Sequence, residues 1–157
     1  MAVEAQNLKG TASVIDGDSL IVAGIEVRLH GMDAPELDQT CLDENGETWA
    51  CGEAAKDALT ELVSGGPVTC RRALHHSRYI GDCRVRGENL SAQMLAKGHA
   101  VVDRRGSRKF VGHESIARRA KLNLWAGEFE WPWRWRDQDY GASGATYLFS
   151  HQRTVSP

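Results

Sequence analysis

The sequence predicts an α+β domain of five strands and three helices, an arrangement that suits a small Greek-key β-barrel. Three observations lead to this prediction. Residues 25–30 alternate between apolar and polar side chains, as a half-buried strand does. Other short apolar runs end in glycine or aspartate turns, and three longer segments repeat apolar residues at helical spacing. The strand count alone does not distinguish this barrel from another α+β domain.

The strands are expected in two groups along the chain. They are residues 11–15, 19–22, 25–30, 68–73 and 79–85. Ala23 and Gly24 form a compact turn between the second and third strands. Within the third strand the apolar side chains point to the core, which leaves Arg28 on the polar face.

Three helices are expected, at residues 52–63, 89–97 and 113–122. A Ser-Gly-Gly-Pro run ends the first. Asn89 can cap the start of the second, and Gly98 lies just past its end. In the third helix Ile116, Ala117 and Ala120 form the expected apolar stripe.

Length and composition indicate one folded domain. The 157 residues, 41% of them hydrophobic, suffice for a single core. We expect residues 1–8 to form a flexible arm, residues 9–136 the domain, and residues 137–157 a weakly ordered tail rich in Gly, Ser and Thr. No segment is long and apolar enough to span a membrane, and the first ten residues lack the apolar core of a signal peptide.

The four cysteines favour two disulfides. None of them forms a Cys-x-x-Cys pair, which argues against a zinc site. Cys41 and Cys51 bracket a polar loop, and Cys70 and Cys83 lie on two expected strands, so we favour the pairs Cys41–Cys51 and Cys70–Cys83. Disulfides imply an oxidising compartment, and we therefore expect a secreted or periplasmic protein whose signal segment is absent from this sequence. The alternative is four reduced thiols in a cytosolic protein.

The charges are distributed unevenly. The net charge of −2 alone argues against a nucleic-acid-binding protein. However, residues 1–63 contain 13 acidic residues against 3 basic ones, and residues 64–136 contain 15 basic residues against 6 acidic ones. The basic half can supply a field that attracts phosphate, although such asymmetry also occurs in proteins without a nucleic-acid partner.

The segment from Val14 to Glu36 concentrates the candidate chemistry. It places Asp18, Asp33 and Glu36 near Arg28, around two short apolar runs. Carboxylate oxygens suit a hard metal ion, and a guanidinium suits a phosphate, so this pattern indicates phosphodiester cleavage. Taken one at a time, Asp18 can simply close an Asp-Gly turn and Glu36 can be a surface acid after a proline.

Three stretches of the chain resemble the staphylococcal nuclease family. They are IDGDSLIVAGIEVRLHGMDAPE, SRYIGDCRV followed by GENLSAQMLAKGHAVV, and ESIARRAKLNLWAGEF. The resemblance implies an OB-fold, a five-stranded Greek-key barrel with three helices. It also implies that Asp18, Asp33 and the backbone carbonyl of Ala34 bind Ca²⁺. Asp16 matches a position that reaches the metal through water, and bonding of the turn backbone is an equally good role for it.

The same resemblance implies the catalytic roles. Glu36 would be the general base or position the attacking water, and Arg28 and Arg78 would bind the phosphate. Two positions depart from the family pattern. The family commonly has tyrosine and glycine just before the second arginine, where this chain has His76 and Ser77. A tyrosine beside the nucleotide pocket is here Asp103, which puts the substrate preference in doubt.

Four tryptophans lie near the end of the expected domain. Trp125, Trp131, Trp133 and Trp135 are interspersed with Arg134 and Arg136. They can stack on bases, but we favour a segment that packs against the domain as a closing strap.

Two functions remain open from the sequence. The first is a Ca²⁺-dependent nuclease acting on DNA and RNA with little sequence preference, which by the resemblance leaves 3′-phosphate and 5′-hydroxyl ends. The second is a catalytically weak or inactive OB-fold module that binds nucleic acid or protein. No interface signal is evident, so we expect a monomer without membrane association.

Overall fold

The computed structural model describes residues 7–75, 78–105 and 107–138. Most of the predicted arm and tail, residues 1–6 and 139–157, lies outside the described residues. The first strand begins at Leu8 and the last helix ends at Gln138. Among the described residues no helix has the length and apolarity that a membrane span requires.

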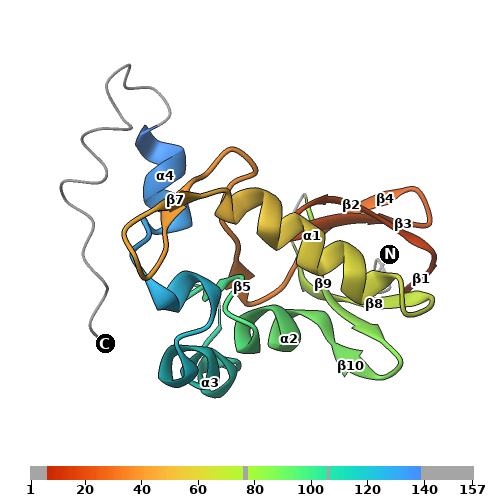
Figure 1. Cartoon of the computed structure of the whole chain (residues 1–157). Coiled ribbons are helices and arrows are strands. Elements are labelled where there is room, and N and C mark those ends of the chain that lie inside the picture. The colour runs from red at the N-terminus through yellow and green to blue at the C-terminus, as the bar shows by residue number, and fades with distance from the viewer. Residues whose placement is uncertain (1–6, 76–77, 106, 139–157) are drawn as a thin grey trace.

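A mixed sheet forms one side of the molecule (Figure 1). Its strands are β1 (Leu8–Gly10), β2 (Ala12–Asp16), β3 (Ser19–Val22), β4 (Ile25–Leu29), β8 (Val68–His75), β9 (Tyr79–Val85) and β10 (Glu88–Asn89). The order is β1-β8-β9-β4-β3-β2, with β10 paired to β9. Strands β2, β3 and β4 form an antiparallel meander, and β4 pairs with β9 in parallel. All five predicted strands are therefore present.

Four shorter strands form two separate pairs. β5 (Met32–Asp33) pairs with β11 (Val101–Val102), and β6 (Cys41–Leu42) pairs with β7 (Thr48–Trp49). Each is only two residues long, too short for an alternating sequence pattern to reveal it.

The four α-helices of the described residues exceed the predicted number by one. They are α1 (Cys51–Val63), α2 (Leu90–Ala96), α3 (Val111–Ala120) and α4 (Pro132–Gln138). The Asn89 side chain accepts a hydrogen bond from the Ala92 N–H at 2.9 Å, which confirms the predicted cap of α2. The apolar stripe predicted for α3 is correct for Ala117, which is buried, and wrong for Ile116 and Ala120, which are exposed. Ile116 is 53% exposed, and Glu114 faces inward with Ala117.

The α+β class is confirmed, but the predicted five-stranded barrel with three helices needs correction. The main sheet has seven strands. Within the described residues its edge strands β1 and β2 are not paired with each other, so the barrel is not closed. The sequence pattern missed β1 because three residues at the border between the expected arm and the expected domain are too few to show a periodicity. It missed α4 because a helix that starts at a proline within a tryptophan-rich segment has no apolar stripe on one face.

The hydrophobic core lies between the sheet and helices α1 and α2. Its largest fully buried side chains include Leu20, Leu29, Leu59, Leu90 and Met94. Gly17, in the turn between β2 and β3, lies against Ala34 and Ala55, where a β-carbon would be 2.7 Å from each of their β-carbons. This close packing presses the Asp-Gly-Asp turn against α1.

Residues 123–138, from the 3₁₀ helix η1 (Asn123–Ala126) through α4, are here called the C-terminal strap. Its aromatic rings form a second core cluster with Cys41, Cys51 and Val101. Trp131 stacks on Trp133 at 4.9 Å between ring centroids. The predicted packing role of the tryptophans is thus observed. In Figure 1, α4 (blue) lies beside the loop that carries β7 (orange).

Both predicted disulfides are present. Cys41–Cys51 joins the β6–β7 hairpin to the first residue of α1. Cys70–Cys83 links directly paired residues of β8 and β9. Two disulfides indicate an oxidising environment.

Candidate active site

Asp18 occupies a turn shaped by its neighbours. The Asp18 N–H donates to Asp16 Oδ1 at 3.1 Å, so Asp16 bonds the turn backbone, one of the two roles open for it. A register shift between Val14 and Asp16 marks a bulge in β2 just before the turn. The bulge and turn direct the Asp18 carboxylate toward Ala34, whose N–H donates to Asp18 Oδ2 at 3.0 Å.

The Asp18 carboxyl is buried and lies in a negative environment. Its residue is only 6% exposed. Burial, followed by the charge of Asp16, raises the pKa of Asp18 to about 7, although Arg28 and the Ala34 N–H act in the opposite direction. A cation that approaches the Asp18 carboxyl would favour its charged form and lower this pKa again.

Asp33 is completely buried on β5, opposite Val101 of β11. Strand β4 presents Arg28 on its polar face, as predicted. Arg28 Nη2 lies 3.5 Å from Asp33 Oδ1 and 4.0 Å from Asp18 Oδ2. Two carboxylates from separate elements thus meet at one guanidinium.

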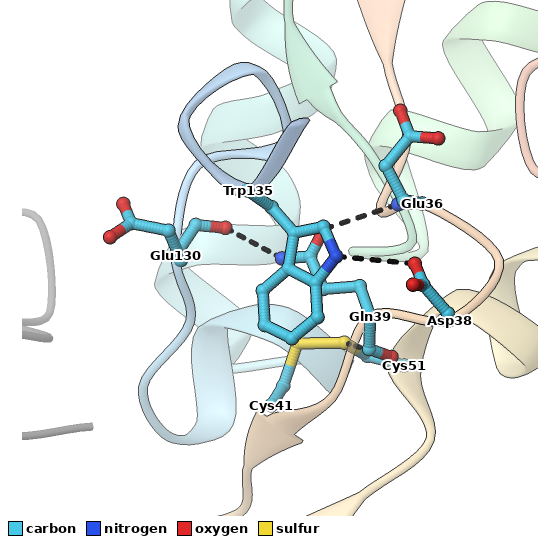
Figure 2. The surroundings of a disulfide bond; sticks show 7 residues. All are labelled: Glu36, Asp38, Gln39, Cys41, Cys51, Glu130 and Trp135. Atoms are coloured by element: carbon cyan, nitrogen blue, oxygen red, sulfur yellow. Dashed lines mark hydrogen bonds between the residues drawn. A yellow bond between two sulfur atoms is a disulfide. The ribbon is translucent and has the colours of Figure 1, made fainter. Parts of the chain in front are cut away.

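Glu36 lies in the loop after β5, and its backbone is firmly placed. The Glu36 N–H donates to Gln39 Oε1 at 3.1 Å, and Gln39 Nε2 donates to the Glu130 carbonyl at 2.8 Å (Figure 2). Gly52 at the start of α1 lies against the Glu36 carbonyl so closely that a β-carbon would collide with it. The Glu36 side chain is 31% exposed and faces a guanidinium, that of Arg136.

Arg136 of α4 bonds both Asp33 and Glu36. Its Nη1 donates to Asp33 Oδ1 at 2.9 Å and to Glu36 Oε1 at 2.6 Å, and its Nη2 donates to Asp33 Oδ2 at 2.7 Å. The hydrogen bond to Asp33, followed by that to Glu36, raises the pKa of Arg136, although burial opposes the shift.

The other predicted residues are not joined to this cluster. Arg78 is exposed just before Tyr79, which pairs with Val27, and no described contact links it to the acids. Its neighbours His76 and Ser77 lie outside the described residues. Asp103 pairs with Arg105 at 3.6 Å.

Sequence reasoning missed Arg136 and Gln39 as site residues. Arg136 is separated from Asp33 by 103 residues, and its position among tryptophans suggested only a packing segment. Gln39 has an uncharged side chain in an unremarkable loop, so only its burial, at 1% exposure, reveals its role.

The donor set fits a divalent cation with few protein ligands. Among the described residues, no group of three or more His, Cys, Asp or Glu side chains is arranged to hold a metal ion. The buried carboxylates of Asp18 and Asp33 are hard-oxygen donors of the kind that a divalent cation binds together with backbone carbonyls, water and phosphate oxygens.

The family model described as staphylococcal nuclease homologue matches residues 26–127 of the chain. The match contains Arg28, Asp33, Glu36 and Arg78, whereas Asp18 precedes it and Arg136 follows it.

Individual relatives agree with this match. A succinoglycan biosynthesis protein, ExoI, from Rhizobium meliloti is 34% identical over 132 residues, covering 80% of this chain and 69% of its own. Two probable staphylococcal-like nucleases of rice, CAN4 and CAN2, are 28% and 32% identical. They share 91% and 76% of this chain but only 28% and 31% of their own lengths, so the chain spans about three tenths of each rice protein.

Proposed function

The chain belongs to the staphylococcal nuclease family, and on that basis we propose that it is a Ca²⁺-dependent nuclease that hydrolyses phosphodiester bonds of DNA and RNA. The observation that carries the proposal is the convergence of Asp18, Asp33 and Glu36 on two arginines. Three acids in one partly buried site lose solvation, an arrangement that a metal-assisted reaction uses and a stability role alone does not require.

Each side chain has a chemical task in this proposal. Asp18, Asp33 and the Ala34 carbonyl would hold the cation, which polarises the phosphate and its neighbouring water when bound. Glu36 accepts the proton of the attacking water, or orients that water in line with phosphorus. Arg28 binds the equatorial phosphate oxygens, on which negative charge builds in the transition state. Arg78 is proposed as a second phosphate-binding residue that acts from the start of β9.

The proposed reaction breaks the bond to the 5′ oxygen and leaves 3′-phosphate and 5′-hydroxyl ends. Because the site offers groups for phosphate rather than for base edges, little sequence preference is expected. The two disulfides support a secreted or periplasmic protein, and a monomer is the simplest form that presents this site.

The test is digestion of single-stranded DNA, double-stranded DNA and RNA with Ca²⁺ and then with EDTA. Wild type should cleave only with Ca²⁺, and Glu36→Gln should lower the rate about 10²- to 10⁴-fold. Glu44→Gln, an exposed acid of the β6–β7 loop, is the matched control and should cleave normally. Products should accept a 5′-phosphate from a polynucleotide kinase without prior phosphatase treatment. Cleavage that persists in EDTA, or full activity of Glu36→Gln, would overturn the proposal.

A second candidate is a catalytically weak module that binds nucleic acid or protein. Two observations favour it: Arg78 has no described contact with the acids, and one relative is named for succinoglycan biosynthesis. Such a module would bind without cleaving, and Ca²⁺ would not increase its affinity for a nucleotide.

A further inference from the structure

The C-terminal strap contacts β5 and the loop that follows it, residues 32–39, at three places. The Glu130 carbonyl accepts from Gln39, Trp135 Nε1 donates to Asp38 Oδ1 at 3.2 Å, and Arg136 bonds Asp33 and Glu36. Figure 2 shows the first two contacts side by side above the Cys41–Cys51 disulfide. The family match ends at residue 127, so all three contacts come from residues that follow it.

The backbone and the carboxylate of Glu36 are restrained by different partners. Gln39 fixes the backbone from one side, since both ends of its buried amide are hydrogen bonded. The carboxylate has one partner among the contacts of the described residues, Arg136 at 2.6 Å. Without that partner, a side chain 31% exposed would sample several rotamers.

The guanidinium also couples Glu36 to Asp33. Nη1 donates to both acids at once, while Nη2 donates to the second oxygen of Asp33. A planar fork with this bonding sets the relative orientation of the two carboxylates, which a lysine cannot do.

We propose that Arg136 is a positioning residue of the active site, which holds the Glu36 carboxylate in a fixed orientation relative to Asp33. This inference rests on the proposed nuclease function. It extends the site beyond the family match and assigns α4 a positioning role in addition to its packing role.

The proposal predicts opposite changes in turnover and in metal affinity. Removal of Arg136 frees Glu36 and therefore lowers kcat. The same removal takes a positive charge away from Asp33, so Ca²⁺ should bind more tightly. A purely structural contribution of α4 would not separate these two quantities, because a disordered site loses both.

The experiment compares Arg136→Gln and Arg136→Lys with Arg134→Gln, an exposed arginine of the same helix. Ca²⁺ binding is measured by calorimetry without substrate, and kcat and KM are measured at saturating Ca²⁺. In Arg136→Gln, kcat should fall about 10- to 100-fold. KM should change less than about 3-fold, and Ca²⁺ should bind roughly 10-fold more tightly. Arg136→Lys should recover part of kcat, and Arg134→Gln should match wild type.

Two results would overturn the inference. One is wild-type kcat in Arg136→Gln at saturating Ca²⁺. The other is unchanged or weaker Ca²⁺ binding in Arg136→Gln, with a melting temperature matched to that of Arg134→Gln. If Arg136→Gln fails to fold, Arg136→Lys carries the test, because it retains the positive charge beside Asp33 but lacks the planar fork. Wild-type kcat in Arg136→Lys would then overturn the inference.

The calorimetry separates this inference from the proposed function. If wild type binds Ca²⁺ but cleaves no nucleic acid, the nuclease proposal fails. The Ca²⁺ affinity of Arg136→Gln then decides whether Arg136 lies at the cation site, and an unchanged affinity overturns the inference in that case as well.

Discussion

Two regions of the molecule build the candidate site by opposite physical means. The acidic segment, residues 16–36, gathers carboxylates along one short stretch and holds them with local backbone hydrogen bonds. The C-terminal strap is held by aromatic packing, in which Trp125, Phe129 and Trp131 form successive edge-to-face pairs. The first region accumulates like charge at a cost in stability, and the second is stabilised by apolar burial.

The difference explains why the two regions meet. Asp18 and Asp33 are buried acids whose mutual repulsion needs positive charge nearby. The strap delivers such a charge on Arg136, and it can hold that guanidinium in place because its own rings are anchored in the core. The site is thus chemically determined by one region and geometrically completed by the other.

After Glu36→Gln, the largest expected effect within the acidic segment is at Arg28. Arg28→Ala should lower kcat about 10²- to 10³-fold, because it removes a fixed guanidinium from beside both proposed metal ligands. Arg78→Ala should cost less, since Arg78 is exposed. Steady-state cleavage of a DNA substrate measures both. An Arg78 effect larger than that of Arg28 would show that the second arginine moves into the site with substrate.

The acidic segment could be predicted from the sequence because its information is local. Asp18, Arg28, Asp33 and Glu36 fall within 19 residues, and strand alternation together with turn chemistry suffices to bring them close. The Asn89 cap of α2 was predictable for the same reason. The roles of these site residues remain predictions.

The rest could not be predicted because it depends on contacts between distant segments. Nothing in the spacing of the tryptophans indicates that Arg136 reaches Asp33, 103 residues away. The inward face of α3 was predicted only in part for a related reason, because Ala117 is buried as expected but Glu114 takes the place expected for Ile116. Glu114 can be buried because it accepts a hydrogen bond from the Val102 N–H at 2.9 Å and pairs with Arg104 at 3.1 Å, so its charge is compensated. A hydrophobic pattern cannot reveal such specific partners.

The next effect concerns pH and tests the charge accumulated by the acidic segment. The pKa of Asp18 is raised from 3.8 to about 7, so the folded state binds this proton more tightly than the unfolded state does. The stabilisation is complete below the unfolded pKa and is lost as pH rises through about 7, a change on the order of a few kcal/mol. Thermal unfolding in EDTA between pH 4 and pH 8 measures it.

The comparison for this prediction is Asp18→Asn, which cannot titrate. The melting temperature of wild type should fall more steeply with rising pH than that of Asp18→Asn, and Ca²⁺ at pH 8 should stabilise wild type more. Parallel pH profiles of the two proteins would mean that folding does not raise the pKa of the Asp18 carboxyl.

A smaller effect is expected at the junction of the two regions, where Cys41–Cys51 lies. Replacement of both cysteines by serine should lower the free energy of unfolding by about 2–3 kcal/mol, the value expected for a short closed loop. It should also lower kcat, because Gln39 lies between this disulfide and Glu36. The pair Cys70→Ser and Cys83→Ser is the control. It should lose stability without an equal loss of activity, since β8 and β9 stay paired. Equal activity losses in both pairs would deny the junction a special role.

The smallest effect tests whether the strap only packs or also binds substrate. Trp133→Ala removes the stack on Trp131 and should lower the free energy of unfolding by about 1–2 kcal/mol. Its affinity for DNA should stay unchanged when compared at equal fractions of folded protein. Ile116→Ala, on the exposed face of α3, is the control and should change stability by less than about 0.5 kcal/mol. A loss of DNA affinity in Trp133→Ala with wild-type stability would instead assign the tryptophans to substrate binding. The strap would then bind substrate in addition to supporting the acidic segment, and packing alone would not explain its aromatic composition.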